Sequence, residues 1–162
     1  MNELSKTTNN QILITSPESL TSDMVTLKRA SKLTLSEATK GAQISALRSE
    51  CKKGVLESSV VALLSQLKMF VKINVTDEWL FDWAEIILKD FWFFKFDELI
   101  LALKEGATQK QYGEVLLSDI IGWLNDYDKR RNDYHINRNK DYKEGYDSNR
   151  GSEMTIKKYL DK

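Results

Sequence analysis

Apolar residues recur every three or four positions through most of this chain, and that spacing decides its fold class. In residues 55–71, for example, Leu56, Val60 and Leu63 fall on one side of an α-helix. No segment alternates polar and apolar residues over the length of a strand, and no internal repeat is visible. The sequence therefore predicts an all-α fold, a compact bundle of about five to six short helices with polar, partly flexible termini.

Capping residues and glycines indicate where the individual helices begin and end. Thr34 is followed three residues later by Glu37, which is the spacing of a capping box. Gly54 separates two helices, and Gly106 is expected near the C-cap of a third. The predicted N-cap residues are Ser16, Thr34, Thr76 and Ser118. The resulting helices cover residues 16–30, 34–51, 55–71, 76–90, 95–106 and 118–131.

This pattern divides the chain into three parts. Residues 1–15 are mostly polar and are expected to form a flexible N-terminal segment. Residues 16–131 are expected to form the helical domain, because 162 residues with 41% hydrophobic content suit a single core. Residues 132–162 are almost wholly polar and are expected to form a helical extension or a tail, with a small amphipathic patch near its end.

The charges balance to zero over the whole chain but not along it. Residues 77–128 carry four Lys or Arg and twelve acids, whereas residues 1–76 and 129–162 each carry ten Lys or Arg and six acids. A neutral total gives no general attraction to nucleic acid or to a membrane. The longest uncharged run in the aromatic region is four residues, 91–94, against the roughly twenty needed to cross a bilayer.

The expected compartment is the cytoplasm. Cys51 is the single cysteine, which excludes an intramolecular disulfide and fits a reducing environment. The first residues lack the basic start and apolar stretch of a signal peptide.

Large aromatic residues are concentrated between residues 79 and 96. Six of them are expected to form core where two short helices meet a third: Trp79, Trp83, Phe91, Trp92, Phe94 and Phe96. A small core does not easily bury so many, and exposed aromatic patches often mark partner sites. Trp92 and Phe94 follow the helix 76–90, so at least one of them is expected to be exposed and to contact a partner. Neighbouring acids would repel phosphates and disfavour base stacking here.

Nothing in the sequence indicates catalysis. His135, the only histidine, lies in a polar stretch, and Cys51 has no visible base beside it. Phosphate-binding glycine loops, metal-ligand spacings and nucleophile elbows are not found. We therefore expect a protein that is not an enzyme and that needs no cofactor or metal.

The segment 129–143 is the one part of the sequence suited to nucleic acid. Its Lys and Arg side chains could neutralise phosphates while Tyr134 and Tyr142 stack on bases. However, Asp128, Asp133 and Asp141 interrupt the basic residues. A solvated helical extension is the preferred interpretation, and weak contact with nucleic acid is the alternative.

Residues 70–131 resemble two groups of phage proteins. The stretch VTDEWLFDWAEIILKDFWFFKFDELILALKEGA, with Trp83 in mid-helix and Asp90 at the helix end, resembles the N-terminal helical domain of phage replicative-helicase loaders of the loader/inhibitor family. The loop with Tyr112 and Gly113 and the later Trp123-Leu124 resemble small proteins of Bacteroidetes phages and mobile elements.

The resemblance implies a non-enzymatic adaptor of DNA replication that binds or loads a replicative helicase in the cytoplasm of a bacterial host cell. A virion-associated or structural protein is one alternative. A nucleic-acid-binding regulator that uses residues 129–143 is another. The candidate partner-binding residues are Trp92, Phe94, Tyr112, Lys129, Arg130, Arg131 and Arg138.

Overall fold

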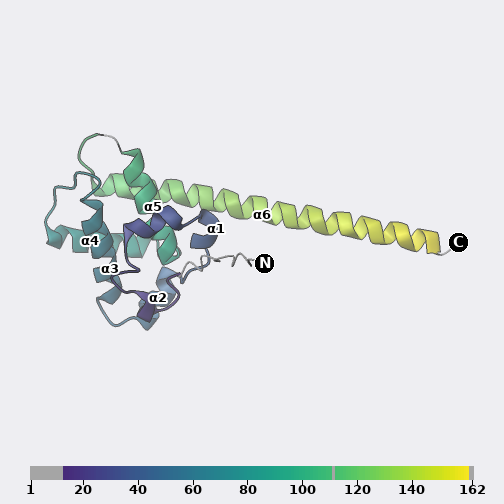
Figure 1. The fold of residues 1–162 in the computed structure, drawn as a ribbon, viewed down its shortest axis with the longest axis horizontal. Coiled ribbons are helices and arrows are strands. Elements are labelled where there is room, and N and C mark those ends of the chain that lie inside the picture. Colours follow the sequence, from purple (N-terminus) through teal and green to yellow (C-terminus); the bar gives the residue numbers. More distant parts are fainter. Residues whose placement is uncertain (1–12, 111, 161–162) are drawn as a thin grey trace, which may run out of the picture. The chain divides into compact units, whose positions relative to one another are not determined.

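The computed structural model describes residues 13–110 and 112–160, and the side chains of its last helix as far as residue 143. The chain divides into two compact units, residues 1–124 and 125–162. Within the described residues the secondary structure is helical, with two isolated β-bridges and no strand (Figure 1). The predicted all-α fold class is therefore confirmed.

Two short 3₁₀-helices precede the α-helices along the chain. The elements are η1 (Pro17–Ser19), η2 (Leu27–Lys32), α1 (Leu35–Ala38), α2 (Ile44–Glu50), α3 (Val55–Leu67), α4 (Asp77–Asp90), α5 (Phe96–Gln109) and α6 (Leu117–Leu160). The predicted starts of α3 after Gly54 and of α4 after Thr76 are confirmed, as is the end of α4 at Asp90.

The single helix predicted over residues 16–30 is wrong, because contacts with α3 replace its internal hydrogen bonds. The Gln66 side chain accepts the Leu27 N–H at 3.0 Å and donates to the Val25 carbonyl at 2.9 Å. These two bonds satisfy backbone groups that a continuous helix would pair internally. The chain therefore forms η1, a turn and η2 in place of one helix.

The helix predicted over residues 34–51 is also interrupted. Thr34 and Glu37 form the predicted capping box, but α1 ends at Ala38 and α2 begins only at Ile44. Between them, a Cβ on Gly41 would lie within 3.1 Å of the Ile14 carbonyl oxygen, and the Ala42 N–H donates to that same oxygen at 2.7 Å. This close approach of two backbone segments requires a residue without a side chain at position 41.

The core of the first unit begins before residue 16. Ile14 is fully buried, and its N–H donates to the Asp97 carboxylate at 2.9 Å. Residues 13–15 therefore belong to the packed structure and not to a flexible segment, whereas residues 1–12 of that predicted segment lie outside the described residues.

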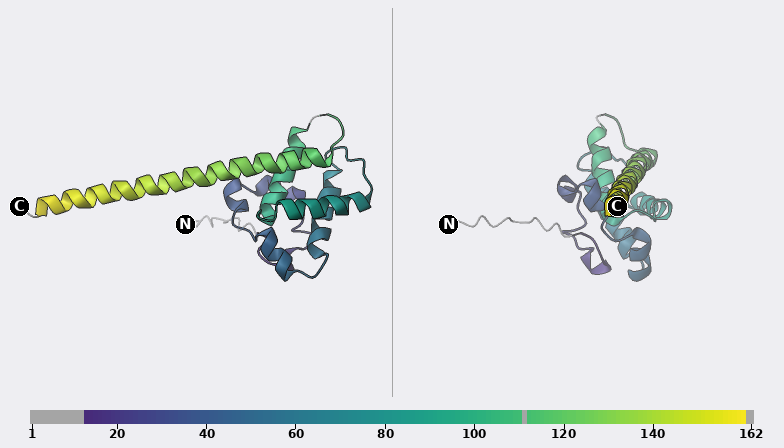
Figure 2. Two further views of the ribbon diagram at one scale, coloured as in Figure 1. Left: turned by 180° about the vertical axis from the view of Figure 1, so that it is seen from behind. Right: turned by 90° about the vertical axis from the view of Figure 1, so that its right-hand side faces the viewer.

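Helix α5 is the most deeply buried element of the first unit. Residues 96–103 of this helix are all buried, and α5 packs against α1, α3 and η2. Helix α4 packs against α3. Figure 2 shows this arrangement from two further sides.

Two predicted helix boundaries near α6 are wrong. Helix α5 continues past Gly106 to Gln109, and Gly106 packs against the indole of Trp123, where a Cβ would collide. Gly106 is thus a packing residue and not a C-cap. Helix α6 begins at Leu117, one residue before the predicted N-cap Ser118, and the Asp119 carboxylate accepts the Leu116 N–H at 2.9 Å.

Helix α6 continues from the first unit through residues 125–160 of the second. It includes residues 132–160 of the segment predicted as a helical extension or tail, and the glycines at positions 145 and 151 do not end it. The predicted amphipathic patch near the end lies outside the described side chains.

Candidate interaction surface

Helix α4 is amphipathic, and its inner side anchors it in the first unit. The buried residues of this helix are Leu80, Trp83, Ala84, Ile87 and Leu88. They recur at helical spacing and belong to a helix that packs on α3. This packing fixes the orientation of the outer side of α4.

The outer side of α4 carries large apolar residues that are half exposed. Trp79 is 58% exposed, Phe81 48% and Ile86 38%. At about 100° per residue, Trp79 and Ile86 lie in line two turns apart, and Phe81 lies on the opposite edge of the exposed side. Asp82 and Glu85 lie between these two edges. We call Trp79, Phe81, Asp82, Glu85 and Ile86 the α4 surface.

The α4 surface is negatively charged. Besides Asp82 and Glu85, the exposed side of α4 contains Glu78 and Asp90 but only one basic residue, Lys89. Within the described part of the chain, neither Asp82 nor Glu85 has an ion-pair partner. Exposed apolar groups next to uncompensated carboxylates favour a partner that offers both apolar and basic side chains.

The two aromatic candidates that follow α4 differ in their exposure to solvent. Trp92 is 53% exposed, whereas Phe94 is fully buried. The Phe94 ring lies edge-on to the rings of Phe91 and Phe93, with centroids 5.2 Å apart in each case. The prediction that at least one of the two is exposed is confirmed by Trp92. Phe94 is not available to a partner, and its place among the candidate contacts is wrong.

Hydrogen bonds to residues 42–45 hold the connection that contains both residues. The Trp92 carbonyl accepts the Ser45 N–H at 3.0 Å, the Phe94 carbonyl accepts the Ile44 N–H at 2.8 Å, and the Phe96 N–H donates to the Ala42 carbonyl at 3.0 Å. The connection between α4 and α5 is a turn, closed by the Phe94 N–H, which donates to the Phe91 carbonyl at 3.0 Å. The turn is anchored on residues 42–45, with the Phe94 side chain in the core and the Trp92 side chain half exposed.

Tyr112 is the most exposed aromatic candidate, at 88%. It lines an open pocket of about 420 Å³ together with Phe70, Lys72 and Lys110. Lys110 lies 3.3 Å from the Asp119 carboxylate, and Glu114 lines the same pocket as Lys72, so the positive charge of the pocket is partly offset. Beside the pocket, the Lys104 ammonium lies 3.4 Å above the Phe70 ring.

The basic candidates all lie on the part of α6 that belongs to the second unit. Lys129, Arg130 and Arg138 are exposed. The Arg131 side chain is only 18% exposed and lies 3.0 Å from Asp128. Trp92 and Tyr112 belong to the first unit.

Three surface residues were missed from the sequence: Trp79, Phe81 and Ile86. Trp79 was predicted to be core, and its 58% exposure shows that this is wrong. A helical projection would have found it, because Trp79 lies about 100° from Leu80 and about 110° from the centre of the buried side.

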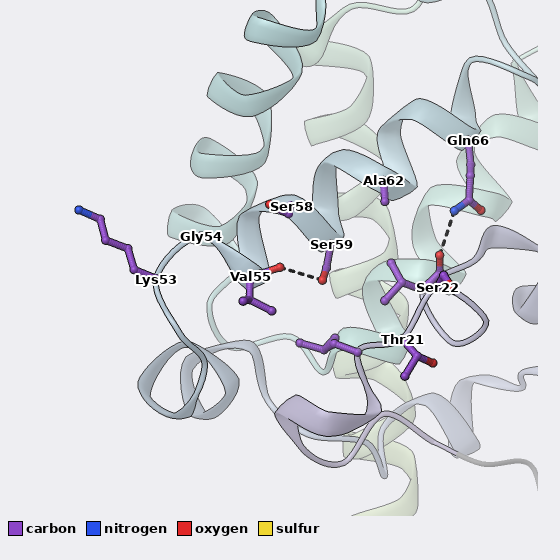
Figure 3. Close-up of a pocket in the computed structure, with 11 residues that line it drawn as sticks. Thr21, Ser22, Lys53, Gly54, Val55, Ser58, Ser59, Ala62 and Gln66 are labelled. Carbon is purple, nitrogen blue, oxygen red and sulfur yellow. Dashed lines mark hydrogen bonds between the residues drawn. The ribbon is translucent and has the colours of Figure 1, made fainter.

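A second pocket, of about 580 Å³, lies between the segment 20–25 and α3 (Figure 3). Two of its polar side chains, Ser59 and Gln66, have partners within the chain. Ser59 donates to the Val55 carbonyl at 2.9 Å, and the Gln66 amide bonds the backbone of residues 25 and 27. The other polar residues of its lining, Thr21, Ser22, Lys53 and Ser58, are exposed.

Neither Cys51 nor the adjacent acids Asp97 and Glu98 show catalytic geometry. Burial, helped by Glu50 and other nearby carboxylates, raises the pKa of Cys51 and so disfavours the reactive thiolate. Glu98 accepts the Lys95 N–H at 2.8 Å and caps α5. Asp97 is fully buried and contacts Arg29 and Ile14, an arrangement that joins three segments of the core.

The described residues contain no group of three or more His, Cys, Asp or Glu placed to hold a metal ion, and no helix among them is long and apolar enough to span a bilayer. Comparisons with protein-family models, with curated proteins and with solved structures found no match to this chain.

Proposed function

We propose that this chain is a non-enzymatic helical adaptor that binds a partner protein through the α4 surface, and that a replicative helicase is the first candidate partner. The observation that carries the proposal is the half exposure of Trp79, Phe81 and Ile86 on a helix whose inner side is fixed in the core. Large aromatic side chains are the groups that most often dominate protein interfaces.

The charge of the α4 surface restricts the chemistry of its partner. Asp82 and Glu85 lie between the apolar edges, so a partner with basic residues around an apolar centre would be complementary. The helicase suggestion rests on the resemblance of residues 70–131 to phage helicase loaders, a range that includes the whole of α4.

Replacing Trp79 and Ile86 together by serine is expected to weaken partner binding at least about tenfold, because two apolar anchors in line are lost. The melting temperature should change by only a few degrees, since both side chains are already half exposed. Affinity capture from the native host followed by mass spectrometry would identify the partner, and titration of the purified helicase would measure the affinity.

The matched control replaces Tyr112 and Leu116 by serine. These residues are 88% and 55% exposed and lie outside α4, so helicase binding should be unchanged. An equal loss of helicase affinity in both double variants would show that the α4 surface is not the binding site. Capture of portal or capsid proteins without helicase would overturn the replication role and favour a virion-associated protein.

A further inference from the structure

One side of α6 in the second unit collects tyrosine and arginine. Tyr127, Arg131, Tyr134, Arg138 and Tyr142 are spaced by four, three, four and four residues. At about 100° per residue these five side chains fall within an arc of about 80°. Along the sequence these five residues are interspersed with acidic and other basic residues, but on the helix they lie on one side.

The accessible part of this arc runs from residue 134 to residue 142. Tyr127 is fully buried, and the Arg131 side chain is 18% exposed beside Asp128. Tyr142 is 67% exposed, Arg138 is exposed and Tyr134 is partly exposed. We call Tyr134, Arg138 and Tyr142 the α6 face.

Arg138 is held between the two tyrosines of the α6 face. Its guanidinium carbon lies 5.8 Å from the centroid of the Tyr142 ring. A hydrogen bond with Tyr142, together with the proximity of Tyr134, raises the pKa of Arg138. The guanidinium is therefore charged at every accessible pH and lies beside two aromatic rings.

The acids of this segment do not share the centre of the α6 face. At the same rotation per residue, Asp133 projects about 140° from Arg138, while Asp141 flanks the face at about 60°. Lys140 and Lys143 project from the opposite side of the helix and are also exposed. The basic residues thus fall into two groups, of which only the Arg138 group contains tyrosines.

We propose that the α6 face binds single-stranded nucleic acid, with Arg138 paired to backbone phosphate and with Tyr134 and Tyr142 stacked on bases. Positively charged side chains bind the backbone phosphates, and aromatic rings stack on bases of any sequence. A second copy of α6 fits this face poorly, because Arg138 would meet Arg138 in a parallel or antiparallel pair centred there. This activity is independent of the α4 surface.

The test is a fluorescence anisotropy titration of the full chain with a labelled oligothymidylate of about 20 nucleotides at about 50 mM salt. Arg138→Gln and Tyr142→Leu are each expected to weaken binding at least about fivefold. The matched control, Lys140→Gln, removes the same charge from the opposite side and is expected to change the affinity less than about twofold. Circular dichroism would verify that α6 remains helical in each variant.

Three results would overturn the proposal. The first is no binding of the wild type at low salt. The second is equal weakening by Arg138→Gln and Lys140→Gln, which would indicate general attraction without a face. The third is equal affinity for a duplex of the same length, which would exclude stacking on bases. If the wild type instead forms a dimer that ignores the oligonucleotide, the partner of this face is a second copy of the chain.

Discussion

Replacing Phe94 by alanine is expected to lower the free energy of unfolding by about 3–5 kcal/mol, whereas replacing Trp92 by alanine should lower it by about 1–2 kcal/mol. Phe94 is fully buried and contacts the rings of Phe91 and Phe93, so its removal leaves a cavity. Trp92 is larger but 53% exposed, so water already covers much of its surface. The order of the two effects is the reverse of the order of side-chain size.

Urea denaturation of the wild type and of both variants, followed by circular dichroism at helical wavelengths, would measure these differences. A change in the urea midpoint without a change in the slope of the transition would show that only the stability has changed. A loss of more than about 3 kcal/mol for Trp92→Ala would mean that Trp92 is core as well. Neither Trp92 nor Phe94 would then be available to a partner.

The elements that the sequence predicted correctly are those determined by local signals. Helix α4 begins after Thr76 and ends at Asp90, because an apolar side repeats at helical spacing between an acidic first turn and the aromatic connection. Helix α3 follows Gly54 for the same kind of reason: that glycine adopts φ 86° at the N-cap, a conformation that other residues rarely adopt.

The elements that could not be predicted depend on distant partners. The backbone of residues 25–27 is bonded by Gln66, about forty residues away, and Ile14 is bonded by Asp97, 83 residues away. The spacing of apolar residues within residues 13–51 gives no indication of these distant hydrogen-bond partners. The local helix propensity of these residues favoured longer helices, but tertiary hydrogen bonds determine the structure that forms.

The candidate surfaces were predictable to different degrees. The exposure of Trp79 follows from its angle to Leu80 on α4, and the α6 face follows from the spacing of its tyrosines and arginines, so both were accessible to a helical projection. The burial of Phe94 was not, because it depends on the turn at residues 91–94 and on the distant segment 42–45 to which that turn is bonded. Exposure in a connection between helices is determined by the segment that it pairs with.

The second large effect is expected at Asp97, whose replacement by alanine should lower the free energy of unfolding by about 3–5 kcal/mol. The carboxylate is fully buried, lies 2.9 Å from the Arg29 guanidinium and accepts the Ile14 N–H at 2.9 Å. Alanine would leave a largely buried cation and a buried backbone donor without this acceptor. Chemical denaturation would measure the loss.

Asparagine at position 97 is the matched variant, and it should cost less than alanine. Its amide oxygen can still accept one of the two hydrogen bonds, and it avoids the burial of a charge. Burial raises the pKa of Asp97 above its ordinary value, although the bond from Ile14 and the charge of Arg29 act in the opposite direction. The charged form is thus less favourable in the folded protein than in the unfolded chain.

This direction of the pKa shift determines how the two proteins should differ with pH. Because the pKa of Asp97 is raised in the folded protein, the contribution of this residue to stability is fully present below the pKa of the unfolded chain, about 3.9. That contribution is lost as the pH rises through the pKa of Asp97 in the folded protein. The advantage of the wild type over Asp97→Asn should therefore be larger near pH 4 than at pH 7. Denaturation midpoints of both proteins across this range test the sign. An advantage that grows as the pH rises would show that the pairing with Arg29 outweighs the cost of burying the carboxylate.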